Sequence, residues 1–333
     1  MPNILDVARR AGVSPMTVSR VVNGSGQVSP ELRARVQQAL AETGYMPNTL
    51  ARNLRVRRTD TIALVLPDMT NPFFTTLAHG VETAARESGI TMILANSDER
   101  EDEEQRLVQA LLQRQVDGLM VATAGTGAGT IRLCRDRGVP LVLVDRPPER
   151  GDVDVVRADS GAGAHDLGLL LAGLGHRVMA VLSGPATVPT AVDRVAGFRR
   201  ALVDESGLPE PLVLHGAFSI ESGRQMTLTA MGHVPRPTAL FAANNFIAIG
   251  VLHALNELGV TVPEGVAVVG FDDLPEAMVT FPFLTVAAQP AFEVGRQGVA
   301  MLLDRLADPE GLPREVILPT RLVIRRSSGG PLA

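Results

Sequence analysis

The chain has 333 residues, 45% of them hydrophobic, which is enough to bury the cores of about two to three domains. This composition excludes a largely disordered protein. A single cysteine, Cys134, excludes an internal disulfide and a cysteine-rich metal site, and no two of the six histidines lie four residues apart. We therefore expect no metal and no cofactor. The first 25 residues hold no apolar run of signal-peptide length, so we expect a cytoplasmic protein.

Charge is unevenly distributed along the chain. Residues 1–60 contain nine arginines against four carboxylates, a net charge of +5, whereas the whole chain carries −5 and its remainder therefore −10. A small basic head on a large acidic body indicates that only the head binds a polyanion. On charge alone, a solvated basic surface is the alternative.

The head reads as three short helices. Residues 4–11 place apolar side chains at helical spacing, between Asn3 as a cap and Gly12 as a terminator. The pairs Ser14–Pro15 and Ser29–Pro30 each supply a cap followed by a proline in the first turn, where its missing N–H costs nothing. Three helices with a tight turn between the first two predict a helix-turn-helix.

The second helix, over residues 15–23, has two different faces. Val18, Val21 and Val22 fall on one arc, which we expect to pack inward. The opposite arc is then free to enter the major groove of DNA, as the second helix of a helix-turn-helix does.

We expect the helix-turn-helix to take up residues 1–46, and residues 47–59 to form a short helix and a linker. A helix over residues 48–55 is too short to be stable without partners.

Residues 60–333 read as an α/β body. Apolar runs such as "TIALVLP" and "VAVVG" alternate with helical segments, which indicates parallel sheets covered on both faces. The first four strands and the later group each form a doubly wound half, with a ligand crevice at the strand carboxyl ends. The uncharged segment 237–256 carries two central asparagines, so we expect a buried strand, turn and helix rather than a membrane span.

The motifs together resemble a known family. "ILDVARRAGVSPMTVSRVVNGSG", "DMTNPFFTTLAHGVETAARESG", "GHRVMAVLSGP", "FAANNFIAIG" and "VAVVGFDD" are similar to transcription regulators of the lactose/galactose repressor (LacI/GalR) family over almost the whole chain. The resemblance implies a periplasmic-binding-protein-like body whose chain crosses between halves near 158–162, 288–292 and 318–322. It also implies that residues 47–59 are a hinge helix and linker, and that residues 60–333 bind an effector and form a dimer. The protein would then be a homodimer that binds double-stranded operator DNA and a sugar-like small-molecule effector, without contact with a membrane.

The resemblance assigns the DNA-binding residues. Pro15, Met16 and Arg20 occupy base-reading positions, and Leu54 matches the hinge leucine that wedges into the minor groove. The guanidinium of Arg20 matches guanine, whereas Met16 offers only apolar contact, for example to a thymine methyl. The full set is Ser14, Pro15, Met16, Thr17, Ser19, Arg20, Asn23, Asn48, Ala51, Leu54 and Arg55.

The resemblance also assigns an effector site, whose carboxylates, amides, guanidinium groups and phenyl rings suit a polyol. The set is Asn71, Phe73, Phe74, Asp145, Arg146, Asp159, Arg194, Phe218, Asn244 and Asp272. Local sequence leaves structural alternatives open: Asn71 could only shape a turn, Asp272 only cap the next segment, and Phe218 only fill a core. The glycine-containing stretch 123–129 lacks a full dinucleotide-binding spacing and predicts a flexible loop at the edge of the cleft.

Two features depart from the family pattern. Many relatives have Asn-Asp where this chain has Asn244 and Asn245, so a negative charge beside the cleft is missing. Val188 and Pro189 stand where some relatives place polar contacts. Both leave the identity of the effector open.

The alternatives to a repressor are a cytoplasmic sugar-binding protein and a sugar-processing enzyme, neither with a role on DNA. The basic helix-turn-helix argues against the first. No nucleophile and base with an orienting partner are evident in the sequence, which argues against the second.

Overall fold

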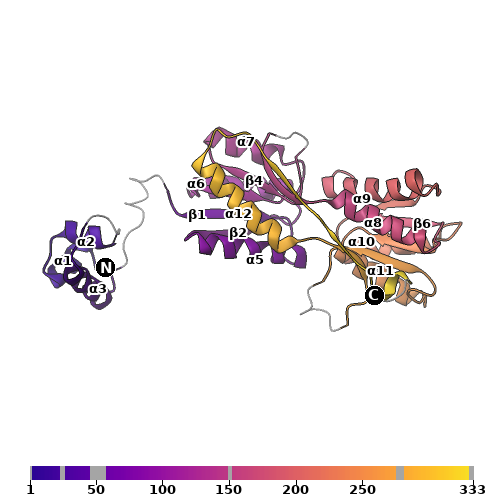
Figure 1. Cartoon of the computed structure of the whole chain (residues 1–333), viewed down its shortest axis with the longest axis horizontal. Coiled ribbons are helices and arrows are strands. Elements are labelled where there is room, and N and C mark those ends of the chain that lie inside the picture. The colour runs from indigo at the N-terminus through magenta and orange to yellow at the C-terminus, as the bar shows by residue number, and fades with distance from the viewer. Residues whose placement is uncertain (1, 23–26, 46–57, 149–151, 275–280, 330–333) are drawn as a thin grey trace. The chain divides into compact units, whose positions relative to one another are not determined.

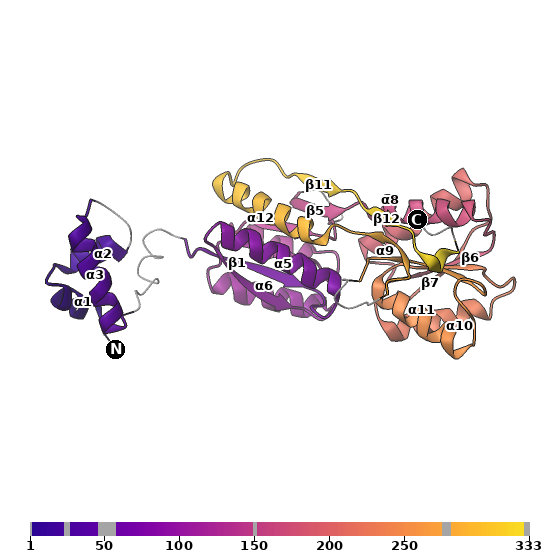
Figure 2. The same ribbon diagram turned by 60° about the horizontal axis from the view of Figure 1, so that its bottom comes forward.

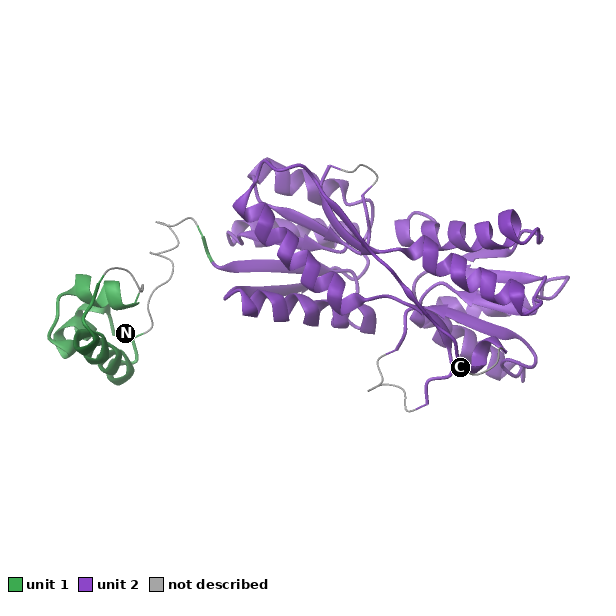
Figure 3. Ribbon diagram, viewed as in Figure 1, with its two compact units in different colours: residues 1–59 green, residues 60–333 purple. Residues whose placement is uncertain are grey.

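The computed structural model describes residues 2–22, 27–45, 58–148, 152–274 and 281–329. The chain divides into two compact units, residues 1–59 and 60–333 (Figure 3). Asn23, Asn48, Ala51, Leu54 and Arg55 lie outside the described residues, so the hinge helix stays a prediction.

The first unit consists of α1 (Ile4–Ala11), α2 (Pro15–Val22) and α3 (Pro30–Thr43). The predicted caps are confirmed: Asn3 accepts two backbone N–H bonds at the start of α1, Gly12 ends that helix in the left-handed region, and Ser29 caps α3. The helices pack around the fully buried side chains of Val7, Val18 and Val36, as the valine arc of α2 predicts.

Lobe 1 of the second unit is built on a parallel sheet with strand order β11-β5-β4-β3-β1-β2. Its strands are β1 (Thr61–Leu66), β2 (Thr91–Asn96), β3 (Gly118–Val121), β4 (Leu141–Val144), β5 (Asp154–Ala158) and β11 (Glu315–Leu318). Helices α5 (Pro72–Glu87) and α12 (Ala291–Ala307) cover one face, and α6 (Glu101–Gln113) and α7 (Ala128–Arg137) cover the other. Figure 1 shows α12 beside α5, although they lie far apart in the sequence.

Lobe 2 repeats this plan with strand order β12-β10-β9-β8-β6-β7. Its strands are β6 (Met179–Ser183), β7 (Leu212–His215), β8 (Ala239–Ala242), β9 (Ala267–Phe271), β10 (Thr285–Ala288) and the antiparallel β12 (Arg321–Val323). One face carries α8 (Ser160–Gly173) and α9 (Pro189–Arg199), which continues as a π-helix over Arg200–Glu205. The other face carries α10 (Ile220–Met231) and α11 (Asn245–Glu257), which lie side by side in Figure 2. A 3-10 turn at Arg326–Ser328 follows β12.

The α/β prediction of two doubly wound halves is confirmed, with one correction. The fifth strand, expected with the later group, belongs to the first sheet, because β5 pairs with β4. An apolar run predicts a buried strand but does not say which sheet it joins. The chain passes between the lobes after β5, between β10 and α12, and between β11 and β12 (Figure 1).

Segment 237–256 forms β8 and α11, the predicted strand and helix. In the part of the chain that the structure describes, no helix has the length and apolar character needed to cross a membrane.

Candidate DNA-binding face and effector cleft

The predicted reading face of α2 is exposed. Pro15, Met16 and Arg20 are solvent-accessible, and the Met16 side chain is 65% exposed while Val18 is fully buried. Exposure of a large apolar side chain beside an arginine fits contact with a base edge in the groove.

The turn before α2 is held by side chains of the predicted DNA set. Ser14 Oγ accepts the Thr17 N–H at 3.2 Å and lies 3.0 Å from Thr17 Oγ1. Ser19, another member of the set, is half-buried. The neighbouring Arg35 has a structural role, because its guanidinium donates to the carbonyl of Ala11 at 2.6 Å and ties α3 to the end of α1.

Nine of the ten predicted effector residues line one cavity of about 30 Å³ between the lobes: Asn71, Phe73, Phe74, Asp145, Arg146, Arg194, Phe218, Asn244 and Asp272. Asp159 does not line it, because its carboxylate caps α8 by accepting the Ala162 N–H at 2.9 Å.

Four cavity residues were not predicted from the sequence: Asp68, Glu99, Thr190 and Gln289. Asp68 and Glu99 follow β1 and β2, so the rule that ligands bind at the carboxyl ends of parallel strands was a usable signal for both. Gln289 lies in the segment between the lobes, within the crossing expected near 288–292, so that crossing was a usable signal for it.

Asp145 and Asp272 occupy equivalent places in the two lobes, directly after β4 and β9. Both have left-handed backbones, with φ of 68° and 69°, which is uncommon outside glycine. Burial is the main cause that raises both pKa values, and that of Asp145 reaches about 6. Strained backbone and a disfavoured charge at matching positions are features of ligand sites.

Asp272 lines the cavity, whereas the segment that its structural alternative would cap includes residues 275–280, which lie outside the described residues. The Oδ1 of Asp272 accepts from Gln289 Nε2 at 2.6 Å. Asn71 has both a structural place and a place at the site. It caps α5 by accepting the Phe73 N–H at 3.0 Å, and it also lines the cavity.

Arg146 is buried and held from three sides. Its Nη1 and Nη2 donate to the two carboxylate oxygens of Glu99 at 2.8 and 2.7 Å, and Nη1 also donates to the Thr123 carbonyl at 2.6 Å. Its guanidinium carbon lies 5.9 Å from the ring centre of Phe74 in lobe 1 and 5.7 Å from that of Phe218 in lobe 2. The two outer nitrogens are thus occupied by the protein.

Arg194 is the matching cation of lobe 2. Its Nη1 donates to the carbonyl of Ala243 at 2.7 Å and lies 4.0 Å from Asp272 Oδ2. Its guanidinium covers the ring of Phe271 at 3.8 Å, and burial lowers its pKa. The group is fixed by packing before any ligand arrives.

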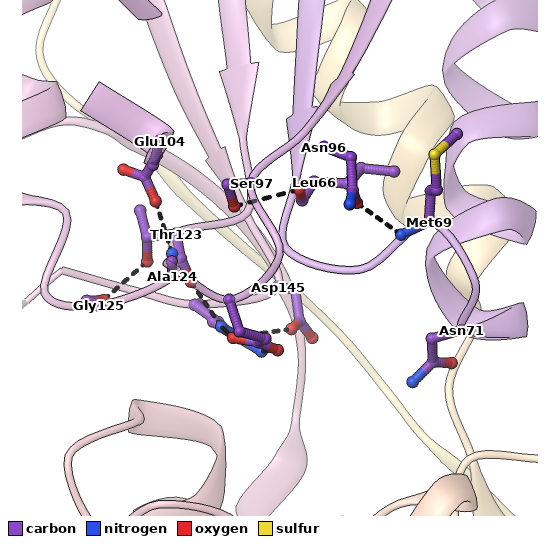
Figure 4. A network of polar contacts seen from close by, with 12 residues as sticks. Leu66, Met69, Asn71, Asn96, Ser97, Glu104, Thr123, Ala124, Gly125 and Asp145 are labelled. Carbon is purple, nitrogen blue, oxygen red and sulfur yellow. Dashed lines mark hydrogen bonds and ion pairs between the residues drawn. The ribbon is translucent and has the colours of Figure 1, made fainter. Parts of the chain in front are cut away.

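The stretch 123–129 borders this site and is fastened by a buried carboxylate (Figure 4). Glu104, 1% exposed, accepts the Ala124 N–H at 2.6 Å and a bond from the Thr130 hydroxyl. Burial raises the pKa of Glu104. The prediction of a flexible loop is therefore incomplete. The bond from Ala124 to Glu104 holds the peptide whose Thr123 carbonyl accepts a hydrogen bond from Arg146.

Three buried polar atoms in the cavity lining have no hydrogen-bond partner among the described residues: Asp145 Oδ1, Arg146 Nε and Gln289 Oε1. Buried polar groups without partners are rare, and at a cavity wall they indicate a ligand that supplies the missing bonds. Two are acceptors and one is a donor. No group of three or more histidine, cysteine or carboxylate side chains among the described residues is arranged to hold a metal ion.

A helix-turn-helix head together with a two-lobed body around a polar cleft defines a DNA-binding regulator that responds to a small molecule. Residues 3–48 match the family described as bacterial regulatory proteins, lacI family, and residues 170–328 match the periplasmic binding protein-like domain. The chain belongs to the lacI family of bacterial regulatory proteins. Its relatives include transcriptional repressors and a transcriptional regulator, and its family is one of regulatory proteins rather than enzymes.

Three similar proteins illustrate the match. The ribose operon repressor of Escherichia coli K12 is 34% identical over 331 residues, which cover 98% of this chain and all of that protein. A lac repressor dimer bound to operator and an anti-inducer has a TM-score of 0.87 at 27% identity, covering 100% of this chain and 99% of that one. A LacI family regulator from Enterococcus faecium with bound ribose has a TM-score of 0.72 at 33% identity, covering 80% and 98%.

Proposed function

We propose that this regulator is a cytoplasmic homodimeric repressor whose affinity for operator DNA is controlled by a small neutral sugar of the ribose type. The sugar binds between the lobes, and the predicted DNA residues of the head bind the operator. The ribose operon repressor and the ribose-bound Enterococcus regulator, both about one-third identical to this chain, support this effector class.

The unpaired polar atoms carry the proposal. Arg146 Nε offers a donor, and it lies 3.8 Å from the carboxylate of Asp145, whose Oδ1 offers an acceptor. A sugar hydroxyl both accepts and donates, so one hydroxyl can satisfy both atoms. Gln289 Oε1 offers a further acceptor, and Phe73, Phe74 and Phe218 supply apolar faces for the carbon skeleton.

The charge of the cavity favours a neutral ligand over a sugar phosphate. Four carboxylates, those of Asp68, Glu99, Asp145 and Asp272, face only two guanidinium groups, and Arg146 is already paired with Glu99. A phosphate would meet a net negative lining. The cavity lies between the lobes, so the lobes must separate to admit a sugar and then close around it.

The test is ribose binding by titration calorimetry and thermal shift on the full chain. Wild type should bind ribose and be stabilised by it, whereas ribose 5-phosphate should bind at least about 10-fold more weakly. Arg194→Ala should abolish binding. Arg199→Ala is the matched control, because Arg199 lies on the same helix with its side chain 49% exposed, away from the cavity. Equal affinity in both variants would contradict the site.

A further inference from the structure

A reciprocal pair of buried amides joins the two lobes. Asn71 of lobe 1 and Asn245 of lobe 2 are 6% and 2% exposed. Asn71 Nδ2 donates to Asn245 Oδ1 at 3.2 Å, and Asn245 Nδ2 donates back to Asn71 Oδ1 at 2.9 Å. Asn71 lines the effector cavity, whereas Asn245 lies in the lining of a separate, largely apolar pocket of lobe 2. The pair therefore connects the site to a residue outside it.

The orientation of each amide is set by the helix that it begins. The Phe73 N–H donates to Asn71 Oδ1 at 3.0 Å, and the Phe246 N–H donates to Asn245 Oδ1 at 2.8 Å. Each amide oxygen accepts from an N–H of its own helix and from the partner's NH₂ group. These helix bonds fix which end of each amide is the oxygen, so each NH₂ group donates to the partner's oxygen. Rotation of one amide by 180° would place NH₂ against NH₂ and oxygen against oxygen across the pair. Only the observed arrangement therefore satisfies both amide oxygens and both NH₂ groups.

This arrangement requires a group that both donates and accepts at position 245. An ionised aspartate keeps the acceptor for the Phe246 N–H but has no donor for Asn71 Oδ1. Two acceptors would then face each other where a 2.9 Å hydrogen bond now lies. Closure of the lobes would lose one bond and gain a repulsion, whereas separated lobes would let water reach both groups.

We propose that Asn245 is a positioning residue for effector binding: through Asn71 it holds the lobes in the closed arrangement that brings the cavity residues together. The inference rests on the proposed effector function of the cleft. Because the pair stabilises closure before the sugar arrives, less of the binding free energy is spent on closing the lobes.

A pH test distinguishes this role from simple packing. Asp68 lines the cavity with Asn71, and Asp273 and Arg325 line the apolar pocket with Asn245. Asp272 lines both. Arg325 already donates two bonds to Asp273, at 2.8 and 2.6 Å. Burial and acidic neighbours would raise the pKa of an aspartate at position 245. Once protonated, its O–H supplies the donor that Asn71 requires.

The first experiment measures lobe separation without a ligand. Spin labels are attached to cysteines at the exposed positions Gln113 and Thr229, one in each lobe, and labelled chains are diluted with unlabelled protein. Cys134 is buried and its thiol pKa is raised to about 12, so it does not compete for the label. Asn245→Asp should show longer, broader distances than wild type at about pH 8 and return toward wild type at about pH 5.5.

The variant is suited to the test because a carboxylate at the first position of α11 is favourable to the helix dipole. Asn256→Asp, at an exposed position near the other end of α11, introduces the same charge and should leave the distance unchanged. If Asn245→Asp matched wild type at both pH values, the inference would be overturned. A change that does not depend on pH would also overturn it, because loss of packing would then be the cause.

The second experiment measures ribose affinity. At about pH 8, Asn245→Asp should bind about 10-fold more weakly than wild type, or about 1.4 kcal/mol, and the ratio should shrink toward one at about pH 5.5. The ratio is compared because Asp145 titrates in both proteins. If wild type bound no ribose, the proposed effector would be wrong, while the ligand-free distances would still decide whether Asn245 holds the lobes.

Discussion

Asp145 lies in a position where function and stability oppose each other, and Asp145→Asn should separate them. The carboxylate is 5% exposed, and its Oδ1 has no partner among the described residues. Burial raises its pKa from 3.8 to about 6, a larger effect than the opposing attraction of Arg146 and Arg194. Asparagine has the same shape and tolerates the left-handed backbone, so the substitution removes the charge with little else.

The pKa gives the size of the effect. At 1.36 kcal/mol per pKa unit, the rise from 3.8 to about 6 means that ionised Asp145 destabilises the folded state by up to about 3 kcal/mol. The folded state holds the proton more tightly than the unfolded state, so stability is lost as pH rises from about 4 to about 6. Because an asparagine amide is also left without a partner, the expected gain at about pH 7.5 is about 1–3 kcal/mol.

The assay is urea unfolding of the full chain followed by far-ultraviolet circular dichroism, at fixed protein concentration because a dimer is expected. Asp145→Asn should be more stable than wild type at about pH 7.5 and equal to it at about pH 4, while its ribose affinity falls. A variant that is no more stable at neutral pH, or whose gain persists unchanged at about pH 4, would refute the reasoning.

Two further predictions concern the cleft anchor and the reading face. Glu104→Ala leaves the Ala124 N–H and the Thr130 hydroxyl unpaired and releases the Thr123 carbonyl from Arg146, so ribose affinity should fall about 10-fold, whereas Glu104→Gln retains an acceptor and most of the affinity. Calorimetry showing the same loss for both would contradict this. Arg20→Ala should abolish discrimination between operator and scrambled DNA in an anisotropy assay, and Met16→Ala should only relax it; equal selectivity would contradict the assignment.

Much of the fold was predictable because helix ends and buried strands are determined largely by residues close together in the sequence. Asn3, Gly12 and Ser29 cap helices for reasons contained within a few residues, and apolar runs report burial whatever the topology. The assignment of β5 failed because strand pairing is a long-range property that an apolar run does not encode.

The cleft was predictable where side chains follow strand ends, and unpredictable where the lobes meet. The apposition of Asn71 and Asn245 joins positions 174 residues apart, and neither residue signals the other in the sequence. Glu104 lies in the first turn of an acidic helix, where its neighbours Glu101, Asp102 and Glu103 look alike, and only the structure shows which carboxylate is buried. The pairing of Asn71 with Asn245 depends on the crossings between the lobes, whereas that of Glu104 is a contact within lobe 1.

A sugar in the cleft is proposed to control the affinity of the head for DNA. The direct measurement is the affinity of the full chain for a DNA sequence selected from a random library, with and without saturating ribose. The full chain should bind the selected sequence preferentially, and ribose should change its affinity about 5- to 150-fold. Arg194→Ala should lose that change and retain its DNA affinity. Binding without sequence preference, or an affinity that ribose does not alter, would contradict the proposal.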